Sequence, residues 1–209
     1  MGKLYPELDQ RLRKFIAAQP IFFVATAPCL TADGGGGHVN VSPKGYRDTF
    51  AVLGPHQVAY LDLTGSGAET IAHLRQNGQI TIMFCAFDTA PKILRLYGTG
   101  RVVLPRDEHW DALAGNFGGH PGVGTAYGGE RAIIVVDVHR IADSCGYSVP
   151  VMELKQERDL LLDWADRKSP AGLTAYRAEK NELSIDGLPA IDPAPAPELA
   201  PQPAGPGRR

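Results

Sequence analysis

Short β-strand patterns recur along most of this chain, and tight turns separate nearly all of them. Each such segment is rich in β-branched and aromatic residues or alternates apolar with polar residues. The expected strands cover residues 21–27, 38–42, 48–54, 57–63, 79–87, 92–104 and 131–141. Only one short helix, at about residues 68–76, interrupts the middle of this series. The pattern therefore predicts a mainly β fold, an antiparallel barrel with flanking helices, rather than a parallel α/β sheet.

Helical patterns lie on either side of the strand series. The expected helices cover residues 6–18, 106–117, 151–168 and 171–181. Gly98 and Gly100 fall inside one predicted strand and indicate a bulge or a sharp bend there. From Pro189 onward the chain is rich in proline, alanine and glycine, so we expect a disordered tail.

The composition argues against several classes of protein. A chain of 209 residues is long enough for one domain with a real core. The formal net charge of -2 offers no basic excess for nucleic acid or an anionic membrane. No apolar run approaches the roughly 18 residues of a membrane span, and the charged first residues do not form a signal peptide. Three cysteines and six scattered histidines lack metal-type spacing, so we expect a soluble cytoplasmic protein without a metal.

The stretch LTGSGAET, residues 63–70, joins a predicted strand to the predicted central helix. Ser66 and Glu69 have the S-x-x-E spacing of a capping box, which places the helix start near Ala68. Backbone N–H groups at such a helix start favour an anion. The stretch matches neither a P-loop, which needs a Lys, nor a dinucleotide fingerprint, since Thr70 replaces the third glycine.

A helix start alone binds an anion weakly, by about 0.3–1 kcal/mol and at most about 2. Micromolar binding requires about 8 kcal/mol, so fixed cations are needed as well. Lys44, Arg95 and Arg101 lie near the ends or middle of predicted strands and are candidates to converge on one phosphate. The alternative is a plain capped helix, with Arg95 paired to a carboxylate such as Asp62 and Lys44 solvated.

The order of these pieces resembles a known family. Five segments carry the resemblance: Val-Asn-Val-Ser-Pro-Lys44-Gly, the turn after Thr64, the helix end His73-Leu-Arg-Gln-Asn77, the strand ITIMF, and Tyr97-Gly-Thr-Gly-Arg101-Val. Over residues 8–141 this arrangement resembles the pyridoxamine 5'-phosphate oxidase-like superfamily. The resemblance implies an FMN-binding split β-barrel, Greek-key-like, that forms a homodimer with flavin at the subunit interface. The segment from Cys145 to Pro189 resembles the end of an uncharacterised subgroup of that family.

The resemblance also implies a flavin site. Lys44 matches the basic residue that contacts the phosphate, Thr64, Ser66 and Gly67 match the phosphate turn, and Arg95 falls near the expected isoalloxazine ring. The neighbouring positions included in the expected site are Asn40, Ser42, Asp62, Gly65 and Thr70. Val39 stands where relatives with a full phosphate clamp carry an arginine, and residues 67–70 depart from their Ser-Arg-Lys turn. The end of the chain lacks the basic segment that binds the vitamin B6 phosphate, so a true pyridoxamine-phosphate oxidase is not expected.

The expected function is therefore an FMN-dependent oxidoreductase that acts on a small organic substrate, with NAD(P)H a possible electron donor. F420 is the alternative cofactor, and a non-catalytic flavin carrier or sensor is the alternative function. No residue is identified as catalytic. The expected organisation is a flavin-binding barrel over residues 1–145, a helical extension packed on it over 146–188, and the tail over 189–209.

Overall fold

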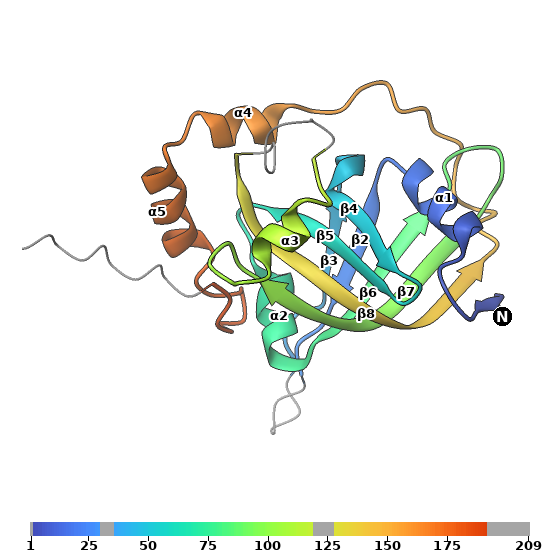
Figure 1. Ribbon diagram of the computed structural model, residues 1–209, viewed down its shortest axis with the longest axis horizontal. Helices are drawn as coiled ribbons and strands as arrows, with labels where there is room; N and C mark the ends of the chain where they lie inside the picture. Colours follow the sequence, from blue (N-terminus) through green and yellow to red (C-terminus); the bar gives the residue numbers. More distant parts are fainter. Residues whose placement is uncertain (1, 30–35, 119–127, 192–209) are drawn as a thin grey trace, which may run out of the picture.

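The computed structural model describes residues 2–29, 36–118 and 128–191 of the chain (Figure 1). The strands form one antiparallel sheet in the order β3-β2-β6-β7-β8-β5-β4, and the short strand β1 (Leu4–Tyr5) pairs with β8. Their bounds are β2 (Phe22–Thr26), β3 (Asn40–Lys44), β4 (Phe50–Gly54), β5 (Gln57–Leu63), β6 (Gln79–Cys85), β7 (Ile93–Val103) and β8 (Glu130–Ser144). The prediction of a mainly β, antiparallel fold with flanking helices is confirmed.

The curved sheet encloses the main hydrophobic core. Alternate residues of each strand point inward, as Val58 and Tyr60 do in β5 and Leu94 and Leu96 do in β7. Four aromatic rings meet inside, with Phe22 lying 5.0 Å from Phe50, 5.5 Å from Tyr60 and 5.8 Å from Phe84 between ring centroids. Helix α1 (Gln10–Ala18) adds Leu12 and Ile16 to this core. A smaller apolar cluster lies on the other face of β5 and β8, beside α3 (Trp110–Ala114).

The bend predicted in the strand at 92–104 is present. The pairing of β7 with β8 shifts register between Tyr97 and Gly98. A Cβ on Gly98 would lie 2.5 Å from the backbone oxygen of Asp137, so only glycine permits this close approach. Pro43 lies in β3 at the end of the sheet, where a missing N–H is tolerated as the sequence indicated.

Helix α2 (Glu69–Asn77) ends as predicted but begins differently. It stops at Gly78, which has the left-handed φ of 70°. The predicted capping box is wrong, because the N-cap is Ala68 and no side chain makes a capping hydrogen bond to the first turn of α2. The Glu69 carboxylate instead accepts a hydrogen bond from the Ile185 backbone N–H at 3.3 Å. A contact with a distant segment therefore replaces the local cap.

The predicted helix at 151–168 is only half present. Helix α4 covers Leu160–Asp166, while residues 151–159 form no helix. Two hydrogen bonds hold this segment away from a helical path: Met152 N donates to Phe87 O at 2.9 Å, and Tyr46 Oη donates to Arg158 O at 2.6 Å. Helix α5 (Pro170–Lys180) follows the N-cap Ser169, whose hydroxyl accepts a hydrogen bond from Gly172 N. Helix α3 is also shorter than the predicted 106–117, and Arg47–Thr49 form a 3-10 turn, η1.

The last described residues are more ordered than their composition predicted. Pro189 pairs with Leu183 in an isolated bridge, Ala190 is fully buried, and Ile191 N bonds to Asn181 O. The predicted start of a disordered tail at residue 189 is therefore wrong, and the remainder of that prediction, 192–209, lies outside the described residues. None of the helices in the described ranges is long and apolar enough to cross a bilayer.

Candidate functional site

A buried ion cluster joins strands β3, β5 and β8. The Asp62 carboxylate, 1% exposed, accepts from Lys44 Nζ at 2.8 Å and from Arg131 Nε at 2.8 Å. Arg131 contacts it a second time through NH2, at 2.7 Å. Burial alone would raise the pKa of Asp62, but the charges and hydrogen bonds of Arg131 and Lys44 outweigh burial and lower it to about 2. Asp62 is thus a permanent anion that fixes two cations.

The same cluster holds the turn that follows β5. Arg131 NH1 donates to Gly67 O at 2.7 Å. From the other side, Arg177 of α5 donates through Nε to Thr64 Oγ1 at 3.0 Å and through NH2 to Glu130 O at 2.8 Å. Asn181 Nδ2 donates to Gly65 O at 2.9 Å. The carbonyl groups of the turn therefore point toward fixed donors in the protein.

The N–H side of the turn is open. Ser66 and Gly67 are exposed, and a Cβ on Gly65 would meet no atom within 4 Å. Within the described part of the chain, no acceptor is bonded to the N–H groups of Gly65, Ser66 and Gly67. A cavity of about 370 Å³ adjoins the turn, with Trp164 and Tyr176 in its wall. These donors, with the cations behind them, fit an anionic group such as a phosphate, although Glu69 lies close to Gly67.

The other predicted polar residues form a hydrogen-bonded chain inside the barrel. Asn40 Nδ2 donates to Thr70 Oγ1 at 3.0 Å and to Thr26 Oγ1 at 3.3 Å, and Ser42 Oγ donates to Asn40 Oδ1 at 3.0 Å. Thr26 Oγ1 in turn lies 3.0 Å from Nδ1 of the fully buried His73, whose pKa is lowered by burial. These side chains bond to one another, although Nε2 of His73 has no hydrogen-bond partner among the described residues. We interpret this hydrogen-bonded set as structural support beneath the turn.

Arg95 lies apart from the other predicted site residues. Leu94 and Leu96 of β7 point into the barrel core, so Arg95 between them occupies the outer face, where it donates to Ser144 Oγ at 3.0 Å. Asp62 lies on the inner face with Val58 and Tyr60. The alternative in which Arg95 pairs with Asp62 is therefore wrong. The idea of a solvated Lys44 is wrong too, because its side chain is 22% exposed and bound to Asp62.

Three residues at this site were not found from the sequence: Arg131, Arg177 and Asn181. Arg131 opens an apolar strand, and a buried guanidinium at that place needs a carboxylate partner. An arginine within an apolar strand was therefore a signal in the sequence that could have identified Arg131. Nothing in the local pattern of α5 connects Arg177 or Asn181 with a turn more than a hundred residues earlier.

Comparison with known proteins agrees with the fold. The family model described as "Pyridoxamine 5'-phosphate oxidase" matches residues 8–145. The chain is 40% identical over 208 residues to the Pyridoxamine 5'-phosphate oxidase family protein ustO of Aspergillus flavus, covering 93% of this chain and 80% of that protein. This chain belongs to the pyridoxamine 5'-phosphate oxidase family. The resemblance predicted from residues 8–141 is confirmed, and the family's split-barrel architecture agrees with the observed sheet.

Solved structures of distant proteins also resemble this family member. HupZ of Group A Streptococcus is 20% identical, with a TM-score of 0.48 over 69% of this chain and 98% of HupZ. An FMN-binding protein from Syntrophomonas wolfei is 17% identical, with a TM-score of 0.46 over 68% of this chain and 85% of that chain. HutZ, the heme storage protein from Vibrio cholerae, is 18% identical, with a TM-score of 0.45 over 67% of this chain and 97% of HutZ.

Proposed function

We propose that this protein is an oxidoreductase that uses FMN as its cofactor and binds the FMN 5'-phosphate at the turn of residues 64–67. One observation carries the proposal: Lys44, Arg131 and Arg177 gather from three separate elements around a turn with open N–H groups. Membership of the pyridoxamine 5'-phosphate oxidase family supports the same cofactor. F420 also carries a phosphate and is the alternative cofactor.

The residues that would hold the phosphate have separate tasks. Lys44 keeps two ammonium protons beyond the one given to Asp62, and Ser66 offers an exposed hydroxyl. The backbone N–H groups of Gly65–Gly67 add donors that need no reorganisation. Arg131 uses its guanidinium on Asp62 and Gly67, so it positions the turn instead of contacting the ligand.

When bound, FMN would supply the redox chemistry, taking a hydride from a donor such as NAD(P)H and passing electrons to a small organic acceptor. The chain's part is to bind and orient the cofactor and to set the charge around it. The family resemblance assigns Arg95 to the ring. Because Arg95 lies on the outer face of β7, the ring would have to extend from the turn to that face. We also propose that two copies of the chain pair with the flavin between them.

The first test is an absorbance spectrum of the purified protein, with mass identification of any compound released by heat. Oxidised-flavin bands and an FMN mass are expected. Lys44→Gln should weaken FMN binding by about 10- to 100-fold, because a charge-assisted hydrogen bond contributes about 1.5–3 kcal/mol.

Lys92→Gln is the matched control for Lys44→Gln. Lys92 is 27% exposed and lies 3.8 Å from the Asp143 carboxylate, so it too is a half-buried lysine beside an aspartate. It lies near β1, away from the turn, and its loss should leave FMN affinity unchanged. A colourless protein that fails to take up added FMN or F420, or equal losses in the two variants, would refute the proposal.

The second candidate is a non-catalytic flavin carrier or sensor. It is favoured by one observation: Asp62, the buried carboxylate at the site, is held as an anion by two cations and is not free to exchange a proton near neutral pH. Steady oxidation of NAD(P)H with added quinone or dye acceptors would support the enzyme. Bound flavin that no donor reduces would support the carrier.

A further inference from the structure

The segment of residues 151–158, here called the strap, spans a cavity on the outside of the barrel. Figure 1 shows it within the long orange connection from β8 to α4. Near its two ends, Met152 N bonds to Phe87 O and Arg158 O accepts from Tyr46 Oη. Between these anchors, no hydrogen bond among the described residues ties the strap to the barrel. The strap lies beyond residues 8–145, which match the family model, so it is an addition to the shared domain.

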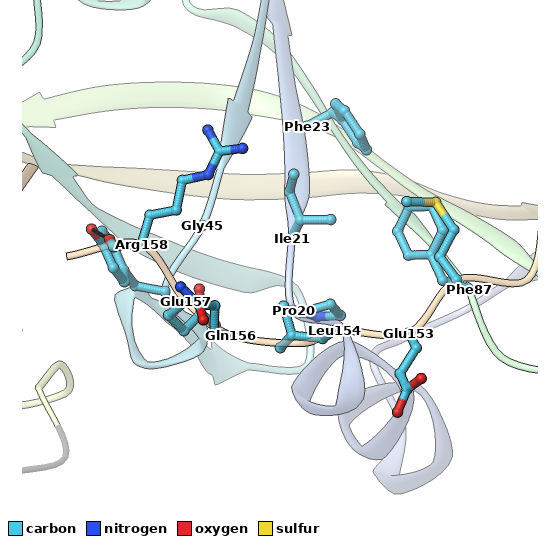
Figure 2. Close-up of a pocket in the computed structure, with 12 residues that line it drawn as sticks. Pro20, Ile21, Phe23, Gly45, Phe87, Glu153, Leu154, Gln156, Glu157 and Arg158 are labelled. Atoms are coloured by element: carbon cyan, nitrogen blue, oxygen red, sulfur yellow. Dashed lines mark hydrogen bonds between the residues drawn. The ribbon is translucent and has the colours of Figure 1, made fainter. Parts of the chain in front are cut away.

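The cavity under the strap has a volume of about 610 Å³, within the roughly 300–1,000 Å³ typical of small-molecule sites. Phe23 of β2, Ile21 just before that strand and Phe87 form an apolar wall, and Leu154 of the strap faces it (Figure 2). Met152 of the strap also lines the cavity. Such a lining fits a ring or a branched hydrocarbon group.

One charged group is directed toward this space. Figure 2 shows the Arg158 side chain extending from the strap toward the sheet, whereas the Glu153 carboxylate points away from Ile21. Within the described residues, the Arg158 guanidinium has no hydrogen-bond or ion-pair partner. A guanidinium matches a carboxylate through two parallel hydrogen bonds. Glu157 also lines the cavity and opposes an anion, so recognition must come from direct contact with Arg158.

The cavity lies on the same face of the sheet as Arg95, the residue assigned to the flavin ring. Phe23 is in register with Met83 of β6, which is in register with Arg95 of β7. Residues in register share one face, so these three side chains form a row on the outer surface. With strands about 4.8 Å apart, the row spans about 10 Å from the cavity to Arg95. A ligand in the cavity would thus lie on the same outer face as a ring placed at Arg95, two strands away from that residue.

We propose that the strap and β2 form the substrate site, which binds a small carboxylic acid with an apolar ring or branched chain and holds its carboxylate on Arg158. The site's role as a substrate site rests on the proposed flavin function. The binding event itself does not, because the cavity is lined by the strap, β2, the segment between α1 and β2, the turn after β3 and Phe87, none of which belongs to the phosphate turn.

Isothermal titration with 3-phenylpropionate and with 3-phenylpropylamine tests the charge preference. These two probes share the apolar part and differ in the sign of the charged group. The acid should bind at least tenfold more tightly than the amine. Arg158→Gln should weaken binding of the acid at least tenfold, while Arg167→Gln, an exposed arginine of the same extension, should leave it unchanged. Equal binding of acid and amine, or an unchanged affinity in Arg158→Gln, would overturn the proposal.

Gly45→Leu tests the location without removing a charge. Gly45 lines the cavity, and a Cβ there meets no atom within 4 Å, so the added side chain has room and should fill the space. We expect at least a tenfold loss of 3-phenylpropionate affinity. The control is Gly54→Leu, at a half-buried position away from the cavity, where a Cβ meets only the Gln57 Cβ at 4.0 Å. Equal affinities in the two variants would contradict the assigned place.

The two proposals fail in different ways. Flavin content is read from the absorbance spectrum and acid binding from the titration. A flavin-containing protein without Arg158-dependent binding overturns the substrate site alone. A colourless protein that binds the acid through Arg158 overturns the flavin function and supports the site.

Discussion

Asp62 holds the most consequential charge in the structure, since it is almost fully buried and binds both Lys44 and Arg131. Asp62→Asn should lower the free energy of unfolding by about 3 kcal/mol, because it leaves two cations without their carboxylate. Urea unfolding at pH 7 measures this change. Asp143→Asn is the control, because its ion pair with Lys92 is more exposed and should cost about 1 kcal/mol or less.

The same carboxylate should make stability depend on acid pH. The pKa of Asp62 falls from its usual 3.8 to about 2 in the folded chain. The folded state therefore binds this proton less readily than the unfolded state, and the ion cluster contributes its stability above about pH 4. Between about pH 4 and pH 2 roughly 2 kcal/mol should be lost. Thermal unfolding across this range should show the loss, and it should be absent in Asp62→Asn.

Arg95 offers a second test at the scale of one residue. A cation beside the flavin ring stabilises the reduced, anionic form, so Arg95→Ala should lower the flavin midpoint potential by a few tens of millivolts, since 30 mV is about 1.4 kcal/mol for two electrons. Arg101→Ala, on the exposed end of the same strand, is the control. An unchanged potential and unchanged cofactor content in Arg95→Ala would refute the assignment.

At the scale of the element, two serines that each precede a helix have different roles. Ser66 precedes α2 but caps nothing, whereas Ser169 accepts from Gly172 N at 3.1 Å and caps α5. Ser169→Ala should destabilise its helix by about 1 kcal/mol, and Ser66→Ala should cost less than about 0.5 kcal/mol. Hydrogen exchange of the first turn of each helix measures both. Equal losses would mean that Ser66 caps α2 in solution.

The conformation of the strap also differs from the preference of its local sequence. Residues 151–159 include glutamate, leucine, lysine, glutamine and arginine, all good helix formers, yet they form no helix. Propensity of a few tenths of a kcal/mol per residue is small beside two anchoring hydrogen bonds and the apolar contacts of Met152 and Leu154. Tertiary contacts thus override a local preference at the place where we propose a substrate site.

At the scale of the whole molecule, the outer face of the edge strand β3 is unusually apolar. Val41 of β3 is 62% exposed and Val39, just before the strand, is 70% exposed. Among the described strands this edge has no partner, and proteins normally protect such an edge with charge. We expect a second copy of the chain to cover this face. Val41→Glu should yield monomers in sedimentation velocity, and flavin placed between the copies should be lost with the dimer.

Val151→Glu is the matched control for this prediction. Val151 is 70% exposed but lies on the strap, so its substitution should leave the dimer and the flavin intact. Dimers of Val41→Glu that retain flavin would show that β3 is not the interface.

The sequence by itself determined the strands, the bend at Gly98, the end of α2 at Gly78 and the family, because period-two alternation, glycine conformations and turn residues act over a few positions. It also marked Lys44 and the turn after Thr64 as belonging to one region. Only the tertiary structure decided their partners. Arg131 binds Asp62 from 69 residues away, and Arg177 binds Thr64 from 113 residues away. Glu69 accepts a hydrogen bond from Ile185 N instead of capping α2 as predicted. Which strand neighbours which, and which distant donor meets a buried carboxylate, depends on packing of the whole chain, and no local pattern encodes it.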